Sequence, residues 1–154
     1  MGKVGPTLES VNYEAALKSL PHGPEFRFVD RVLELQPGVS GVAEYTVRPD
    51  AYFLRGHFPG QPMMPGVLMI EALAQVAGIV AQSDPQIGSL PNLKLTAIRA
   101  AKILGAAFPG DRLVIEANIN GRLGGLIQAS ATIRITDKVI VDAELTLAGD
   151  APNR

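Results

Sequence analysis

The sequence contains no cysteine and no tryptophan among its 154 residues, and it has no excess of charge of one sign. The absence of cysteine excludes disulfide bonds, thiolate metal sites and a cysteine nucleophile. Acidic and basic residues nearly balance, at 15 and 14, so there is no electrostatic case for nucleic acid or an anionic membrane as a partner. Apolar residues make up 47% of the chain and charged residues 19%, which predicts a globular protein with a substantial core.

Long hydrophobic runs are also missing. The longest, residues 67–81, is interrupted by Glu71 and Gln75 and is shorter than the roughly 20 residues that a membrane-spanning helix needs. The N-terminus lacks a basic region followed by an apolar stretch, which is the pattern of a secretory signal. We therefore predict one cytoplasmic domain over residues 1–154, with a short N-terminal helical region in residues 1–22 and a disordered tail over about residues 150–154.

The second half of the chain alternates apolar and polar residues, and this period of two predicts strands with one buried face. Short polar turns connect these segments, as expected of an antiparallel sheet. The clearest predicted strands cover residues 113–120, 127–136 and 139–147. Further predicted strands cover residues 28–35, 42–47 and 93–98.

Two segments are predicted to be helical, a short one over residues 13–19 and a long one over residues 67–82. The long segment is apolar nearly all round, and such a helix must be buried on most sides. The economical packing wraps the antiparallel sheet around this helix. The sequence therefore predicts an α+β fold.

The loop before the long helix is rich in glycine and proline, which together fill 6 of the 11 positions in residues 56–66. Such a loop is stiff and suited to holding one side chain in place, here that of His57. Where the loop enters the helix, the backbone N–H groups of Gly66 and Val67 have no partner within the helix. Because they also lie at the positive end of the helix dipole, they form a candidate site for developing negative charge.

Glu71 and Gln75 are the polar residues of the long helix, and their spacing places them on one face. Burial in so apolar a helix disfavours the ionised carboxyl, and a general acid must hold its proton. Gln75 can hydrogen-bond that carboxyl and orient it. A catalytic site is favoured by the combination of the rigid loop that holds the histidine, the helix N-terminus and the buried carboxyl.

Each of these residues also has a structural interpretation when taken alone. His57 can simply pack in its loop, and Glu71 can pair with an arginine at an interface. Gln75 and His22 can both be purely structural. The His, Asp and Glu residues show no metal-ligand spacing, and the sequence has neither a nucleophile-elbow serine motif nor a phosphate-binding glycine loop, so we expect no metal and no cofactor.

Residues 56–67, together with residues 70–75, resemble the signature of the 3-hydroxyacyl-acyl-carrier-protein dehydratases (FabZ-like). The resemblance continues in residues 20–22, 28–32 and 109–111, and so spans nearly the whole chain in order. It implies the hot-dog fold, in which a curved antiparallel sheet wraps around one long helix. It also implies removal of water from a (3R)-3-hydroxyacyl thioester on an acyl carrier protein, in fatty-acid or related lipid or polyketide synthesis.

The same resemblance implies roles for individual residues. His57 and Glu71 form the implied catalytic pair, contributed by different subunits of a homodimer, or of a trimer of such dimers. Gly66 matches the position whose N–H polarises the thioester carbonyl, with the N–H of Val67 beside it. The implied loop along the substrate tunnel contains Phe58, Pro59, Met63, Met64 and Pro65.

The chain departs from this family after Ile98, where Leu104 and Gly105 replace two basic residues and Ala106 replaces a proline. Residues 23–27 also differ from the more apolar family pattern. Both differences bear on the length of the substrate and on the carrier partner, and they favour a member of a specialised pathway. The candidate carrier-docking residues are Arg55, Arg99, Lys102, Ile103 and Leu104.

Three alternatives stay open. A hot-dog acyl thioesterase would use Glu71 to activate water, which leaves His57 unexplained. A non-catalytic acyl-binding protein, or a degenerate partner subunit of a heteromeric dehydratase, would not need both His57 and Glu71. The related dehydratase-isomerases typically carry aspartate in place of Glu71, which makes isomerase activity less favoured.

Overall fold

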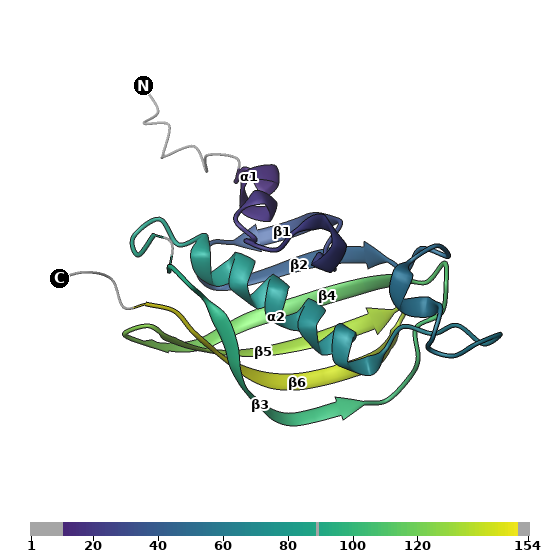
Figure 1. The fold of residues 1–154 in the computed structure, drawn as a ribbon. Coiled ribbons are helices and arrows are strands. Elements are labelled where there is room, and N and C mark those ends of the chain that lie inside the picture. The colour runs from purple at the N-terminus through teal and green to yellow at the C-terminus, as the bar shows by residue number, and fades with distance from the viewer. Residues whose placement is uncertain (1–10, 89, 151–154) are drawn as a thin grey trace.

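The computed structural model describes residues 11–88 and 90–150 (Figure 1). Both predicted helices and all six predicted strands are present, and the predictions for residues 1–10 and 151–154 lie outside the described residues. No helix of the described part is long and apolar enough to cross a membrane. The elements are α1 (Tyr13–Lys18), β1 (Arg31–Gln36), β2 (Ser40–Thr46), α2 (Gly66–Gln82), β3 (Lys94–Ile103), β4 (Arg112–Leu123), β5 (Leu126–Ile135) and β6 (Lys138–Ala148), with short 3-10 turns at Pro24–Phe26 and Tyr52–Leu54.

The six strands form one sheet in the order β1-β2-β4-β5-β6-β3, and all five pairings are antiparallel. The sheet curves around α2, which lies along its concave face (Figure 1). A curved antiparallel sheet wrapped around one long helix is the hot-dog arrangement, so the predicted α+β hot-dog fold is confirmed.

The core lies between α2 and the inward-facing residues of the sheet. On β4 the alternation places Leu113, Ile115 and Ala117 wholly inside, as the period of two predicts. The helix approaches β2 closely, because a Cβ atom at Gly41 would lie only 2.7 Å from Cγ2 of Val80. Glycine at this position therefore sets how near the helix lies to the sheet.

Strand β3 runs to Ile103 and not to Ile98 as predicted. It forms an edge of the sheet and almost all its residues are exposed, so it lacks the alternation that reveals a half-buried strand. Its register shifts between Arg99, opposite Glu144, and Lys102, opposite Asp142, which leaves an extra residue in a β-bulge.

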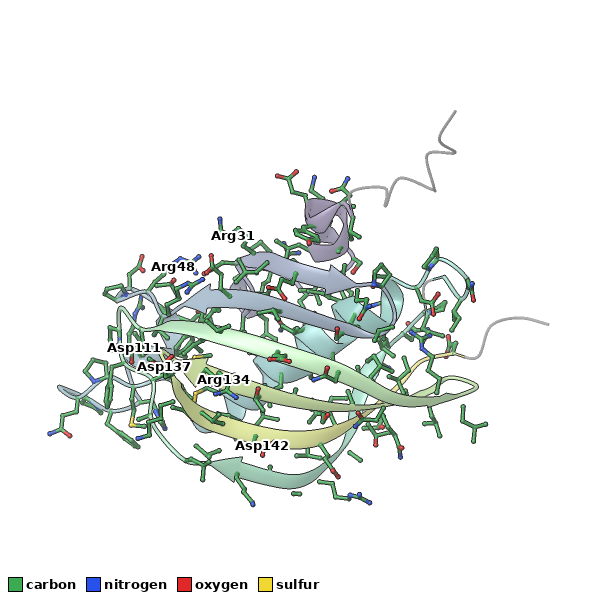
Figure 2. The ribbon with its side chains drawn as sticks, turned by 180° about the vertical axis from the view of Figure 1, so that it is seen from behind. Arg31, Arg48, Asp111, Arg134, Asp137 and Asp142 are labelled. Atoms are coloured by element: carbon green, nitrogen blue, oxygen red, sulfur yellow. The ribbon has the colours of Figure 1, made fainter. Side chains whose placement is uncertain are left out.

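Charged side chains are spread over the convex face of the sheet, which Figure 2 shows from behind. There Glu44 on β2 accepts a hydrogen bond from Arg112 on β4 and forms an ion pair with Arg31 on β1 at 2.8 Å. Partial desolvation acts to raise the pKa of the Glu44 carboxyl, but the guanidinium groups of Arg112 and Arg31 outweigh it and hold the pKa below its usual value. This carboxylate therefore links three neighbouring strands.

Candidate active site

His57 is held by its own loop through two contacts with Met63. The ring nitrogen Nδ1 lies 3.0 Å from the Met63 carbonyl oxygen, and the Met63 N–H donates to the His57 carbonyl at 2.8 Å. Because a carbonyl oxygen only accepts, Nδ1 carries the proton in this hydrogen bond. In the neutral ring, Nε2 is then the unprotonated nitrogen, which can act as a base.

The rest of the loop is fixed by a tight turn. Phe58 and Gln61 exchange two backbone hydrogen bonds of 3.0 and 2.9 Å, and Gly60 between them has φ 75°, in the region that favours glycine. The Phe58 ring stacks on the His57 ring with their centroids 4.2 Å apart, and the peptide bond joining these residues is cis. The histidine is thus presented from a closed turn.

The residues predicted to line a substrate tunnel lie in different surroundings. Phe58 and Pro59 are exposed, whereas Met63 and Pro65 are half-buried. Met64 is wholly buried in the core, and its N–H donates to the carbonyl of Ala107 at 2.8 Å. In the single chain, Met64 is therefore a packing residue and does not border open space.

Helix α2 begins directly after this loop. The N–H groups of Leu68 and Met69 both donate to the Pro65 carbonyl, at 3.0 and 3.2 Å, and no side chain caps the helix start. The N–H groups of Gly66 and Val67 precede these bonds and remain as donors at the helix end. A Cβ atom at Gly66 would lie 2.6 Å from Cδ1 of Ile103, so the end of β3 packs directly against the start of the helix.

Glu71 is half-buried and contacts Gln75, as its helical spacing predicts. The Gln75 amide nitrogen donates to Glu71 Oε1 at 3.3 Å and to the Phe26 carbonyl at 2.8 Å. The amide oxygen accepts from the Phe28 N–H at 2.8 Å. Gln75 is almost wholly buried, so a single side chain ties the Glu71 carboxyl to the backbone of the N-terminal segment.

Sequence reasoning did not place His22 in the site, but the structure brings it to Glu71. Its Nε2 lies 3.2 Å from Glu71 Oε1, and its ring stacks on Phe26 at a centroid distance of 6.2 Å. No periodic pattern links the N-terminal segment to α2, so the resemblance of residues 20–22 to the family's N-terminal block was the available signal. His22 and Glu71 both line a cavity of about 370 Å³.

The structure does not bring His57 and Glu71 together within one chain. The cavity that Glu71 lines is bordered by His22 and Gln75 and not by His57. Among the described residues, no hydrogen bond or ion pair joins His57 to Glu71. The two proposed catalytic groups are therefore presented separately, each with its own supporting contacts.

The candidate docking residues are all exposed, but the charged ones differ in whether they form an ion pair. Arg99 pairs with Glu144 at 3.0 Å, so its charge is partly offset. The apolar side chains of Ile103 and Leu104 are 50% and 57% exposed, and Ile103 packs against the start of α2. Arg55 and Lys102 are exposed as well. Within residues 11–88 and 90–150, no group of three or more His, Asp or Glu side chains could hold a metal ion.

The fold is that of a hot-dog protein, with His57 held in the loop before α2 and Glu71 on α2 itself. A family model described as a FabA-like domain matches residues 20–144, and the chain belongs to this family.

Several relatives named 3-hydroxyacyl-[acyl-carrier-protein] dehydratase FabZ are similar to the chain. The protein from Thermoanaerobacter sp. (strain X514) is 39% identical over 128 residues, which cover 83% of this chain and 89% of that protein. The protein from Ruminiclostridium cellulolyticum is 41% identical over 130 residues, which cover 84% and 90%.

Solved structures share the fold. The dehydratase heterocomplex ApeI:P from Xenorhabdus doucetiae matches with a TM-score of 0.75 and 21% identity over 90% of this chain and 91% of that chain. Zebra fish thioesterase superfamily member 2 matches with a TM-score of 0.65 and 17% identity over 86% and 90%. At these identities the likeness concerns the fold alone.

Proposed function

We propose that this chain is a 3-hydroxyacyl-acyl-carrier-protein dehydratase of fatty-acid or related lipid or polyketide synthesis. The observation that carries the proposal is the hydrogen bond from His57 Nδ1 to the Met63 carbonyl, which leaves Nε2 free to act as a base in the loop that leads into α2. Membership of the FabA-like family and the names of the relatives support the substrate class. We expect the protein to act in the cytoplasm and to need no cofactor.

The chemistry follows from the placement of these groups. Nε2 of His57 removes the C2 proton of the (3R)-3-hydroxyacyl thioester, and the C–H electron pair moves toward the thioester carbonyl. The N–H of Gly66, assisted by that of Val67, stabilises the negative charge on the oxygen. One such donor typically contributes about 10²–10³-fold to the rate, and general acid–base help contributes about 10²–10⁴-fold.

Collapse of the enolate then expels the C3 hydroxyl, which Glu71 protonates, so that the products are a trans-2-enoyl thioester and water. Gln75 and His22 both contact Oε1 of Glu71 and so hold the acid in one orientation. After the reaction, a proton must pass from His57 to Glu71 through solvent before the next turnover.

The active site would be shared between the subunits of a homodimer, with His57 from one and Glu71 from the other. The separate placement of these residues within one chain supports this arrangement. Strand β3 supports it as well, because it leaves one edge of the sheet unpaired and exposes Ile98 and Ile103 by about half. The family resemblance also allows a trimer of such dimers.

One assay separates the proposed activity from its alternatives. The purified protein is incubated with 3-hydroxyacyl and enoyl thioesters, while enoyl absorbance and free thiol are followed separately. A dehydratase interconverts hydroxyacyl and enoyl thioesters without releasing thiol. Thiol release would identify a thioesterase, and no change in either signal would identify a non-catalytic protein.

Subunit mixing tests the shared site. We expect His57→Ala and Glu71→Gln proteins each to lose at least about 100-fold in activity, the lower range of general acid–base catalysis. When subunits exchange, heterodimers should regain one of two sites, because one interface then carries both wild-type residues. Activity that never rises above the separate variants, despite demonstrated exchange, would show that each site is built within one chain.

A further inference from the structure

The cavity beside Glu71 is the first part of a longer groove along α2. A second hollow, of about 560 Å³, shares part of its lining with that cavity. The shared lining residues are Pro21, His22, Gln82, Leu93 and Lys94. Along the floor, α2 presents Glu71, Gln75, Gly78 and Gln82, which recur on one face of a helix. At 1.5 Å per residue, this floor is about 16 Å long from Glu71 to Gln82.

The middle of the groove is apolar, and its floor is made of small residues. Its floor is made by Ala74 and Gly78, and its walls include Leu93, Leu95 and Leu147. A Cβ atom at Gly78 would meet only Cδ2 of Leu93, at 3.6 Å, so the glycine leaves this part of the groove open. Such a lining fits a hydrocarbon chain, since binding removes the apolar surface of both the chain and the groove from water.

The far end of the groove is polar again. Gln82 and Lys94 line both hollows, and Ser19 and Asn92 lie beside them. Among the described residues, neither the Gln82 amide nor the Lys94 ammonium has a side-chain hydrogen bond or ion pair within the chain. Both groups are hydrogen-bond donors. The groove is therefore polar at its two ends and apolar between them.

We propose that this groove holds the acyl chain of the substrate and selects acyl groups whose far end carries a neutral hydroxyl, of an alcohol or a phenol. The inference rests on the proposed function and adds the class of acyl group. A chain ending in a methyl group would place hydrocarbon against Gln82 and Lys94, whereas a hydroxyl oxygen accepts their hydrogen bonds. Asp150 accepts a hydrogen bond from the Asn92 amide at 2.7 Å, which places a carboxylate at the same rim, and repulsion from it favours a neutral group over a second carboxylate.

Binding of non-reacting ligands tests this directly. Saturated acyl-pantetheine thioesters of one length, ending in methyl, hydroxyl or carboxylate, are titrated into the wild-type protein by calorimetry. We expect the hydroxyl-ended ligand to bind roughly three- to tenfold more tightly than the methyl-ended one, as one or two net hydrogen bonds allow. Gln82→Leu and Lys94→Met should each reduce this ratio, whereas the matched control Lys138→Met, at the exposed start of β6, should leave it unchanged.

The outcomes separate this inference from the proposed function. Equal or tighter binding of the methyl-ended ligand overturns the inference, and so does a hydroxyl preference that persists in both groove variants. Tighter binding of the carboxylate-ended ligand overturns the choice of a neutral group. Dehydration of 3-hydroxybutyryl-pantetheine, too short to reach Gln82, tests the proposed function alone. If this substrate is not dehydrated but the preference for the hydroxyl-ended ligand is retained, the assignment of the groove stands and the proposed dehydratase activity is wrong.

Discussion

The carboxyl oxygen Oε1 of Glu71 receives two side-chain contacts, from Gln75 at 3.3 Å and from His22 at 3.2 Å. Gln75 lies one helical turn away, so a period of 3.6 residues was enough to predict its contact. His22 arrives through the folding of the N-terminal segment, which Gln75 itself anchors by bonding to the backbone of Phe26 and Phe28. A contact built by tertiary packing leaves no local period, which is why His22 was interpreted as structural.

The contact between His22 and Glu71 leads to a test at the scale of one residue. We expect His22→Ala to lower kcat/KM about tenfold. In the proposed reaction Glu71 becomes a carboxylate as it protonates the leaving hydroxyl, and a hydrogen bond to a charged group contributes about 1.5–3 kcal/mol, part of which solvent replaces. His22→Gln, which keeps a donor near Oε1 of Glu71, should recover most of the loss. The measurement is steady-state enoyl formation, with thermal unfolding as the control for folding.

A purely structural role for His22 predicts something different. In that case, activity and melting temperature would fall together in His22→Ala. His22→Gln would then rescue neither kcat/KM nor stability. Full activity in His22→Ala would remove the residue from the site altogether.

At the scale of the elements, burial decides how well the sequence predicts boundaries. Strands β4, β5 and β6 are half-buried, and their predicted bounds agree with the structure to within a few residues. Strand β3 was predicted too short, because an edge strand exposed on both faces carries no alternation and its bulge interrupts the pairing. A strand with no buried face shows no alternation of apolar and polar residues, so the sequence does not predict its full length.

The close approach of α2 to β2 predicts a packing conflict. We expect Gly41→Ala to destabilise the protein by about 1–3 kcal/mol, the usual cost of overpacking, because its Cβ atom would lie 2.7 Å from Cγ2 of Val80. Urea unfolding measures the change. Val80→Ala removes the opposing methyl groups, so the double variant should be more stable than the sum of the two single changes allows. Simple additivity would show that this contact does not limit the approach of the helix.

The carboxylate of Glu44, between Arg31 and Arg112, makes the pairing of three strands depend on pH. Because the pKa of Glu44 is lowered in the folded protein, its contribution is fully present above the ordinary glutamate value of 4.5 and is lost as the pH falls through the lowered value. We expect Glu44→Gln to be less stable than wild type at pH 7, with a difference that shrinks below about pH 4.5. Urea midpoints at pH 7, 5 and 3.5 check this, and a constant difference across that range would contradict it.

At the scale of the whole molecule, the sequence predicted the fold and offered His57 and Glu71 as candidate site residues, and it did not predict the groove. The existence of the strands and of the buried helix follows from hydrophobic patterning, which is a property of each element. The groove depends on residues from the N-terminal segment, α2 and β3, among them Pro21, Gly78 and Lys94. Its lining is set by how those elements pack, and no single segment of the sequence contains it.

The overall charge of −1 and the exposed apolar residues at the end of β3 bear on the choice of carrier protein. Carrier proteins are acidic, and docking to basic patches mainly raises the association rate and is screened by salt. Since Arg99 is paired with Glu144, and Leu104 and Gly105 bring no charge, we expect little preference for a generic carrier over a pantetheine mimic. The measurement is kcat/KM for both substrates across a salt series.

Adding charge back should change this result. Leu104→Lys/Gly105→Arg is expected to raise both the carrier preference and its salt dependence. A strong, salt-sensitive preference in the unaltered protein would show that its basic docking surface lies elsewhere.

The anchoring of the N-terminal segment by Gln75 also bears on how the chain can change over evolutionary time. Both of its anchoring bonds go to main-chain atoms, the carbonyl of Phe26 and the N–H of Phe28. Main-chain atoms are the same whatever side chain is present, so substitutions in residues 23–27 leave the partners of these two bonds in place. The link between Gln75 and this stretch therefore does not depend on which side chains the stretch carries, whereas a change at Gln75 removes the link and one of the contacts to the Glu71 carboxyl.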